Sequence, residues 1–140
     1  ALWHTRLAKE AMSSKVIRTP SGREFAFPNV YKNKHGRVSN FTQIKNYPVQ
    51  SFATADIVPV ALLHIEKLLD TMKSCVVNTV HDSIVIDVHP EEERAVIEVI
   101  AQTNRDLPDL ITIRWGVVFN VPLLLEAKIG PNWLDTHDVS

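Results

Sequence analysis

The sequence of 140 residues has little cysteine, little glycine and no long apolar run. Its single cysteine, Cys75, excludes a disulfide framework and a zinc site built from several cysteines. No apolar run approaches the roughly 20 residues of a membrane span, and residues 1–10 lack the apolar stretch of a secretory signal. The four glycines form no glycine-rich phosphate-binding motif, so the sequence lacks the fingerprint of folds that bind nucleotides through such a loop. We therefore expect a cytoplasmic protein without a membrane partner.

Composition and length are those of an ordinary globular domain, but the charge is unevenly distributed. Hydrophobic residues make up 45% and charged residues 22% of the chain, and the net charge is −1. We expect a single domain over residues 1–140. Residues 1–50 carry nine Lys or Arg residues and two acidic residues. Residues 51–140 carry six Lys or Arg residues and fourteen acidic residues. Such a split indicates either a side that faces a polyanion or a dipolar surface without a partner.

The hydrophobic pattern predicts short strands among helices, and hence an α+β fold with a small antiparallel sheet and helices packed on one face. A basic loop is expected between residues 29 and 40. Helices are expected over residues 2–15, 42–70 and 90–104, with Pro48 and Pro59 interrupting the second. Strands are expected in a hairpin within residues 16–27, in a second hairpin of residues 76–80 and 84–88, and at residues 111–115 and 121–129.

The tip of the second predicted hairpin carries the sharpest chemical signal. His81, Asp82 and Ser83 stand between two β-branched runs, which indicates a tight polar turn. A carboxylate presented on such a tip can bind a divalent cation through hard oxygen atoms, as magnesium prefers. The alternative is a plain turn in which Asp82 bonds its own backbone.

A pair of amides in the second predicted helix gives a further signal. Asn46 and Gln50 are four residues apart, so in a helix they lie on one face about 6 Å apart. Side-chain amides can reach base-edge acceptors in the minor groove without reading much sequence. The alternative is that both amides bond the backbone around Pro48.

Four blocks that include these two features, in this order, resemble DNA polymerases of family A, the family of bacterial DNA polymerase I and of many phage replicases. The blocks are residues 19–28 (TPSGREFAFP), residues 46–57 (NYPVQSFATADI), residues 80–83 (VHDS), and residues 121–126 with 130–133 (VPLLLE and GPNW). Residues 80–83 resemble the family's motif C. The resemblance covers nearly the whole chain and implies the C-terminal part of the polymerase palm.

The resemblance implies a role for each candidate site residue in template-directed nucleotidyl transfer. Asp82 would be one of two carboxylates that bind two Mg²⁺ ions, and His81 would lie near the primer terminus. Asn46 and Gln50 would touch the minor groove of the primer–template. The basic residues of the loop, Lys32, Lys34 and Arg37, would lie against the DNA backbone, where contacts are independent of sequence.

The sequence also departs from the family pattern. Ser83 stands where Glu is usual, Ser51 where Gly is common, and Thr42 where many members carry Arg, which weakens a metal or water contact and one DNA contact. The family's motif A aspartate and its fingers helix, which grips the incoming deoxynucleoside triphosphate, match nothing in the chain. We therefore expect an incomplete polymerase that needs a polypeptide with these parts.

Two alternatives stay open at this point. Single-subunit RNA polymerases often carry His-Asp-Ser in motif C, as residues 81–83 do, although residues 46–57 and the ending do not resemble that family. The other alternative is a non-catalytic DNA-binding subunit of a split polymerase.

Overall fold

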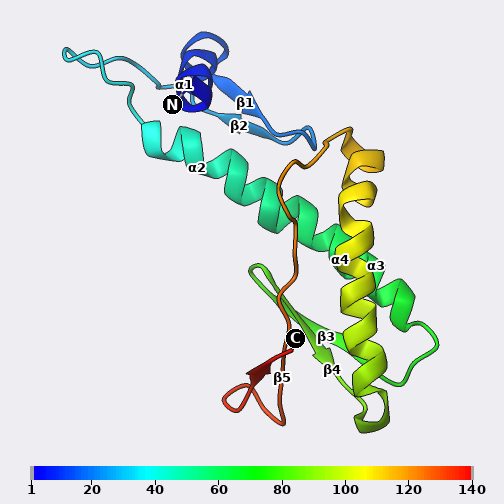
Figure 1. Ribbon diagram of the computed structural model, residues 1–140. Helices are drawn as coiled ribbons and strands as arrows, with labels where there is room; N and C mark the ends of the chain where they lie inside the picture. Colours follow the sequence, from blue (N-terminus) through cyan, green and yellow to red (C-terminus); the bar gives the residue numbers. More distant parts are fainter. Residues whose placement is uncertain (1, 140) are drawn as a thin grey trace. The chain divides into compact units, whose positions relative to one another are not determined.

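The computed structural model describes residues 2–139, and the chain divides after Ile57 into two compact units. The first unit contains α1 (Leu2–Ser14), β1 (Val16–Arg18), β2 (Glu24–Ala26), α2 (Phe41–Ser51) and the π-helical segment η1 (Phe52–Ile57) (Figure 1). Its core joins α1, β1 and α2 through the buried side chains of Leu7, Ala11, Ile17, Phe27, Val30 and Ile44. The predicted helix and hairpin at the start of the chain are confirmed.

The predicted basic loop is an ordered finger in the first unit, between β2 and α2 (Figure 1). Lys32 and Val38 form an antiparallel bridge. Beyond the bridge, the backbone N–H of Asn33 donates to the Arg37 carbonyl at 2.9 Å, and the N–H of Gly36 to the Asn33 carbonyl at 2.9 Å. The Asn33 side chain accepts from the N–H groups of His35 and Arg37, both at 2.9 Å. The backbone of the finger thus makes its hydrogen bonds within the finger and with the Asn33 side chain. The basic side chains of the finger are exposed.

The second unit builds its core between two helices and a hairpin. It contains α3 (Val58–Leu69), β3 (Cys75–Val80), β4 (Ser83–Asp87), the 3₁₀ turn η2 (Pro90–Glu92), α4 (Glu93–Trp115), β5 (Lys128–Ile129) and β6 (His137–Asp138). Ile65 and Leu69 of α3 pack with Val96 of α4, and Val76, Ile84 and Ile86 of the hairpin pack against them. Within residues 2–139, no helix is long and apolar enough to cross a membrane.

The α+β class is confirmed, with the strands paired as three antiparallel hairpins: β1 with β2, β3 with β4, and β5 with β6. In the central pair, Val80 lies opposite Ser83 and Cys75 opposite Asp87, with a bulge between Val76 and Asn78. A bulge inserts one unpaired residue and increases the local twist. One face of this hairpin packs on α3 and α4, as the sequence predicts.

The strand predicted at residues 111–115 is wrong, because α4 continues through Pro108 to Trp115. Thr103, Leu107 and Ile111 are buried at spacings of four residues, which is one face of a helix. The β-branched run from Ile111 suggested a strand, but burial of the helical stripe outweighs that preference. Gly116 ends the helix with a φ of 69°, and its N–H donates to the Thr112 carbonyl at 2.8 Å.

The strand predicted over residues 121–129 forms only at its end, as β5. Leu125, in the middle of this segment, is bonded by a side chain in place of a strand. The Asn104 amide nitrogen of α4 donates to the Leu125 carbonyl at 3.0 Å, and the Leu125 N–H donates back to the Asn104 side-chain oxygen at 2.7 Å. One amide side chain thus replaces the peptide group that a neighbouring strand would have offered.

Candidate functional site

The β3–β4 hairpin presents His81 and Asp82 at its two-residue turn. Both side chains are exposed, and His81 adopts a left-handed backbone with a φ of 56°. The Asp82 carboxylate accepts no hydrogen bond and forms no ion pair with any side chain among residues 2–139. The Asp82 side chain therefore does not bond its own backbone within the described residues, and the carboxylate is available to an external partner.

Apolar packing along one face of the hairpin explains how a polar tip can be held in place. Val76, Ile84 and Ile86 contact the core of the second unit, whereas Val80, next to the tip, is 39% exposed. The strands are thus anchored along one face as far as Ile84, two residues after Asp82, and the exposed turn extends beyond this packing. This arrangement holds the carboxylate on a defined support without burying it.

Asp82 fits the requirements of one ligand of a divalent cation, but of one ligand only. Its oxygens are hard donors, and magnesium usually keeps several waters and takes one or two carboxylates together with substrate phosphates. Within the described part of the chain, no group of three His, Cys, Asp or Glu side chains could hold a metal ion. Asp82 is therefore not part of a complete metal site in this part of the chain.

Asn46 and Gln50 lie on α2, as the sequence predicts. Both are exposed and four residues apart, so they share one face of the helix. Pro48, which lies between them, is buried on the opposite side, next to the core residue Ile44. Directly after Gln50 the helix widens into η1, where the Thr54 hydroxyl donates to the Gln50 carbonyl at 2.8 Å.

Seven of the nine basic side chains of the first unit fall into two groups. Some are engaged with protein groups: Arg18 pairs with Glu24, Arg23 pairs with Asp56, Lys15 donates to the Val30 carbonyl, and Lys45 lies over the Phe41 ring. The side chains of Lys32, Lys34 and Arg37 are exposed on the finger and have no such partner within residues 2–139. They are free to bind anions.

The structure brings together the predicted residues in three local sets and reveals a fourth set that the sequence did not single out. The predicted sets are the finger, the face of α2 and the β3–β4 tip. The fourth set is a cluster in the first unit, in which buried Asp56 accepts from the Ser21 hydroxyl at 2.6 Å and from Arg23 Nη2 at 2.9 Å. An acidic residue in an otherwise small and apolar stretch, residues 53–57, was the available signal.

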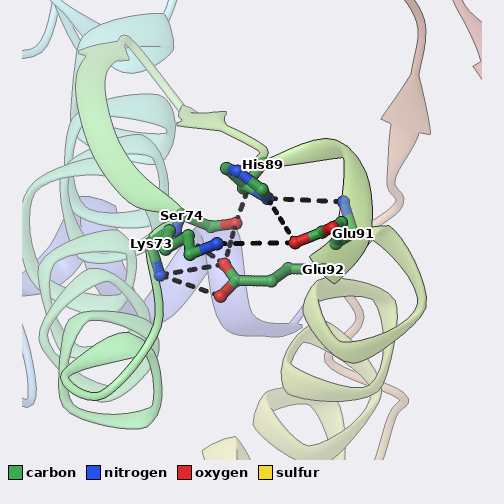
Figure 2. Close-up of polar contacts among 5 residues, drawn as sticks. All are labelled: Lys73, Ser74, His89, Glu91 and Glu92. Carbon is green, nitrogen blue, oxygen red and sulfur yellow. Dashed lines mark hydrogen bonds and ion pairs between the residues drawn. The ribbon is translucent and has the colours of Figure 1, made fainter.

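A polar cluster closes the base of the β3–β4 hairpin. Figure 2 shows Glu92 accepting from the backbone N–H groups of Lys73, at 2.9 and 3.0 Å, and Ser74, at 2.8 Å, and from the Ser74 hydroxyl at 2.7 Å. The Ser74 hydroxyl oxygen also accepts from the His89 N–H at 2.9 Å. These bonds, led by that of Lys73, hold the pKa of Glu92 below its usual range. The cluster ties the start of β3 to the segment that follows β4.

Comparison with known proteins agrees with the resemblance seen in the sequence. The family model of DNA polymerase family A matches residues 1–135. Among curated relatives, a DNA polymerase I of Synechocystis sp. is 28% identical over 90 residues, which are 64% of this chain and 8% of the relative. A DNA polymerase I of Deinococcus radiodurans is 27% identical over 121 residues, which are 86% of this chain and 12% of the relative.

A third relative, a DNA polymerase I of Caldicellulosiruptor bescii, is 31% identical over 93 residues, which are 65% of this chain and 10% of the relative. The matched part is therefore about a tenth of the length of each of these relatives. The family model covers nearly all of the chain, and the four sequence blocks lie within the matched residues. The chain therefore belongs to DNA polymerase family A.

Proposed function

We propose that residues 1–140 are the C-terminal palm segment of a template-directed DNA polymerase, in which Asp82 is a ligand of the catalytic Mg²⁺ ions. The observation that carries the proposal is the exposed, unpartnered Asp82 carboxylate on an anchored hairpin tip. Membership of family A supports DNA synthesis over RNA synthesis.

Each residue of the tip has a distinct part in the proposed reaction. When bound, the metal ions activate the primer 3′ hydroxyl and stabilise the charge on the leaving pyrophosphate. Asp82 supplies negative charge and an oxygen ligand from the exposed tip of the packed hairpin. His81 precedes it in the turn and offers an imidazole to the primer terminus.

The first unit binds the primer–template duplex in this proposal. Between the start of the chain and Ile57 there are nine basic and three acidic residues, a net charge of +6. Lys32, Lys34 and Arg37 bind backbone phosphates, which sets position without reading sequence. Asn46 and Gln50 present amides to the minor groove, where acceptors occur at every base pair.

The proposed enzyme needs partners that this chain does not supply. A second carboxylate is required at paired metals, and cations are required on the deoxynucleoside triphosphate. We propose that a polypeptide region carrying motif A and the fingers provides both, in the cytoplasm of a bacterial or phage-infected cell. The matched part is about a tenth of the length of these relatives.

Asp82→Asn tests the proposal in a polymerase completed with motif A and the fingers. The substitution keeps the size of the side chain and removes its charge, so the extension rate should fall by about 10³ or more, which corresponds to about 4 kcal/mol. Duplex binding should change little. The control is Asp87→Asn, which removes an exposed carboxylate from β4 of the same hairpin and should leave the rate near normal. An Asp82→Asn enzyme with more than a tenth of normal turnover would refute the assignment.

A further inference from the structure

The ion pair of Arg23 and Asp56 combines a buried acid with a half-exposed base. The Asp56 side chain is 8% exposed and the Arg23 side chain is 46% exposed. Asp56 Oδ1 accepts from Arg23 Nη2 at 2.9 Å, while Oδ2 accepts from the Ser21 hydroxyl at 2.6 Å. Asp56 is therefore fixed on both oxygens, and it binds one nitrogen of the guanidinium, Nη2.

The turn that carries Arg23 is itself tightly held. The Thr19 N–H donates to the Arg23 carbonyl at 2.9 Å, and the Gly22 N–H donates to the Thr19 carbonyl at 2.9 Å. Gly22 has a φ of 88°, a conformation that residues with a Cβ rarely adopt. The Thr19 and Ser21 hydroxyls lie 2.7 Å apart and share a hydrogen bond. Both the backbone and the far end of Arg23 are thus restrained.

The guanidinium of Arg23 retains unused donors. An arginine offers five N–H groups in a planar fork, and within residues 2–139 this one makes its only side-chain hydrogen bond with Asp56. The surrounding unit has a net charge of +6 and, in the proposed function, binds duplex DNA. A restrained fork loses less rotamer freedom on binding phosphate than a free arginine does.

We propose that Arg23 is a further phosphate-binding residue of the first unit and that Asp56 is the positioning residue that holds it. The inference rests on the proposed binding of DNA and adds to it a residue pair outside the finger and the amide face. The alternative is that the pair only stabilises the hairpin turn against η1. The two interpretations predict opposite effects of removing the negative charge of Asp56.

The test compares Asp56→Asn with Glu24→Gln in the full 140-residue chain. Each substitution neutralises an acid paired with an arginine of the same hairpin, but the Arg18–Glu24 pair is exposed on both sides. Removing a negative charge near DNA should by itself strengthen binding. Glu24→Gln should therefore leave the affinity unchanged or raise it. Asp56→Asn should lower it at least about twofold, because the fork of Arg23 loses its support.

Affinity is measured by fluorescence anisotropy of a short labelled primer–template duplex at several salt concentrations. Arg23→Gln should weaken binding several-fold and reduce the magnitude of the slope of log affinity against log salt by about one. Arg23→Lys keeps the charge but not the fork, and should bind more weakly than wild type. Circular dichroism and thermal melting identify the temperature range in which each variant is folded, and binding is compared there.

The outcomes separate this inference from the proposed function. Wild-type chain that fails to bind DNA with a steep salt dependence overturns the proposed function. Binding that is weakened by Lys32→Ala but not by Arg23→Gln overturns the inference alone. Folded Asp56→Asn that binds as tightly as wild type, or more tightly, likewise overturns the positioning role. If Asp56→Asn does not fold, Arg23→Lys decides, and wild-type affinity in that variant contradicts the proposal.

Discussion

His81 occupies the turn of the β3–β4 hairpin in a left-handed conformation, with a φ of 56°. This conformation costs a residue with a Cβ about 1 kcal/mol or more. Glycine would adopt it without that cost. In the proposed function the imidazole acts at the primer terminus, and the left-handed strain is a cost of placing it there.

Replacing His81 by glycine should therefore separate stability from function. Relief of the left-handed strain and the greater freedom of unfolded glycine, each about 1 kcal/mol, oppose one another, so the melting temperature should hardly change. Primer extension by the completed polymerase should nevertheless fall. A large drop in melting temperature would mean that the imidazole stabilises the hairpin, and unchanged extension would mean that it has no role at the primer terminus.

If the proposed contacts are correct, Gln50 and Lys32 should contribute differently to DNA binding and primer extension. Gln50→Ala removes an amide aimed at the minor groove, so the completed polymerase should extend more slowly and respond differently to mismatched primer termini. Lys32→Ala removes one phosphate contact, so binding should weaken alike for all duplexes and its salt dependence should flatten. Equal effects of the two substitutions on matched and mismatched duplexes would contradict the assignment of Gln50 to the minor groove and Lys32 to a phosphate.

At the scale of elements, the sequence predicted the helices and hairpins whose structure depends on the pattern of their own residues. The β3–β4 hairpin follows from two β-branched runs around a polar turn, and α3 follows from Ala61, Ile65 and Leu69 on one face. The segment around Leu125 has the alternation of a strand, but its partner is the side chain of Asn104. The Arg23–Asp56 pair likewise joins residues 33 positions apart. Such long-range contacts leave no periodic signal in the sequence.

Asn104→Leu tests whether this amide holds the segment that precedes β5. The substitution leaves the N–H and carbonyl of Leu125 without their partner, which costs about 1–3 kcal/mol where the groups stay shielded from water. We expect a lower melting temperature and faster hydrogen exchange at the Leu125 amide. Gln102→Leu, on the same helix, removes the bond to Asp106 and should itself lower the melting temperature. It leaves both bonds to Leu125 intact, so exchange at the Leu125 amide should stay as in wild type. Unchanged exchange at Leu125 in Asn104→Leu would contradict the account.

Two carboxyl groups should make the stability of the second unit sensitive to acid. The pKa of Glu92 is lowered chiefly by the Lys73 N–H, and the pKa of Asp106 chiefly by the Gln102 amide and then by His64. Each group binds protons less readily when folded, so its stabilising contribution is present above the unfolded pKa and disappears as the pH falls through the folded pKa.

The melting temperature should accordingly fall as the pH drops below the ordinary carboxyl range, and Glu92→Gln should flatten that dependence. Neutralising Glu92 weakens its bonds to the Lys73 and Ser74 backbone, so this variant should already melt lower near neutral pH. Glu93→Gln changes the exposed neighbour and should follow the wild-type curve. Identical profiles of melting temperature against pH for Glu92→Gln and wild type would show that the cluster of Figure 2 does not contribute to the pH dependence of stability.

At the scale of the whole molecule, charge and chemistry are divided between the two units. The first unit has a net charge of +6 and carries the finger and the α2 amides, whereas the second has a net charge of −7 and carries the hairpin tip. A single carboxylate binds magnesium weakly, because the ion stays hydrated unless several ligands converge. We therefore expect DNA binding by the chain alone, and nucleotidyl transfer only with a second carboxylate.

The most direct test of this account is extension of a labelled primer by the purified 140-residue chain, alone and with an added polypeptide that carries motif A and the fingers. We expect no extension by the chain alone in any mixture of deoxynucleoside triphosphates. We expect templated synthesis after the addition, and none when the chain carries Asp82→Asn. Templated extension by the chain alone that disappears in Asp82→Asn would show that these residues already form a complete polymerase, and would contradict the account.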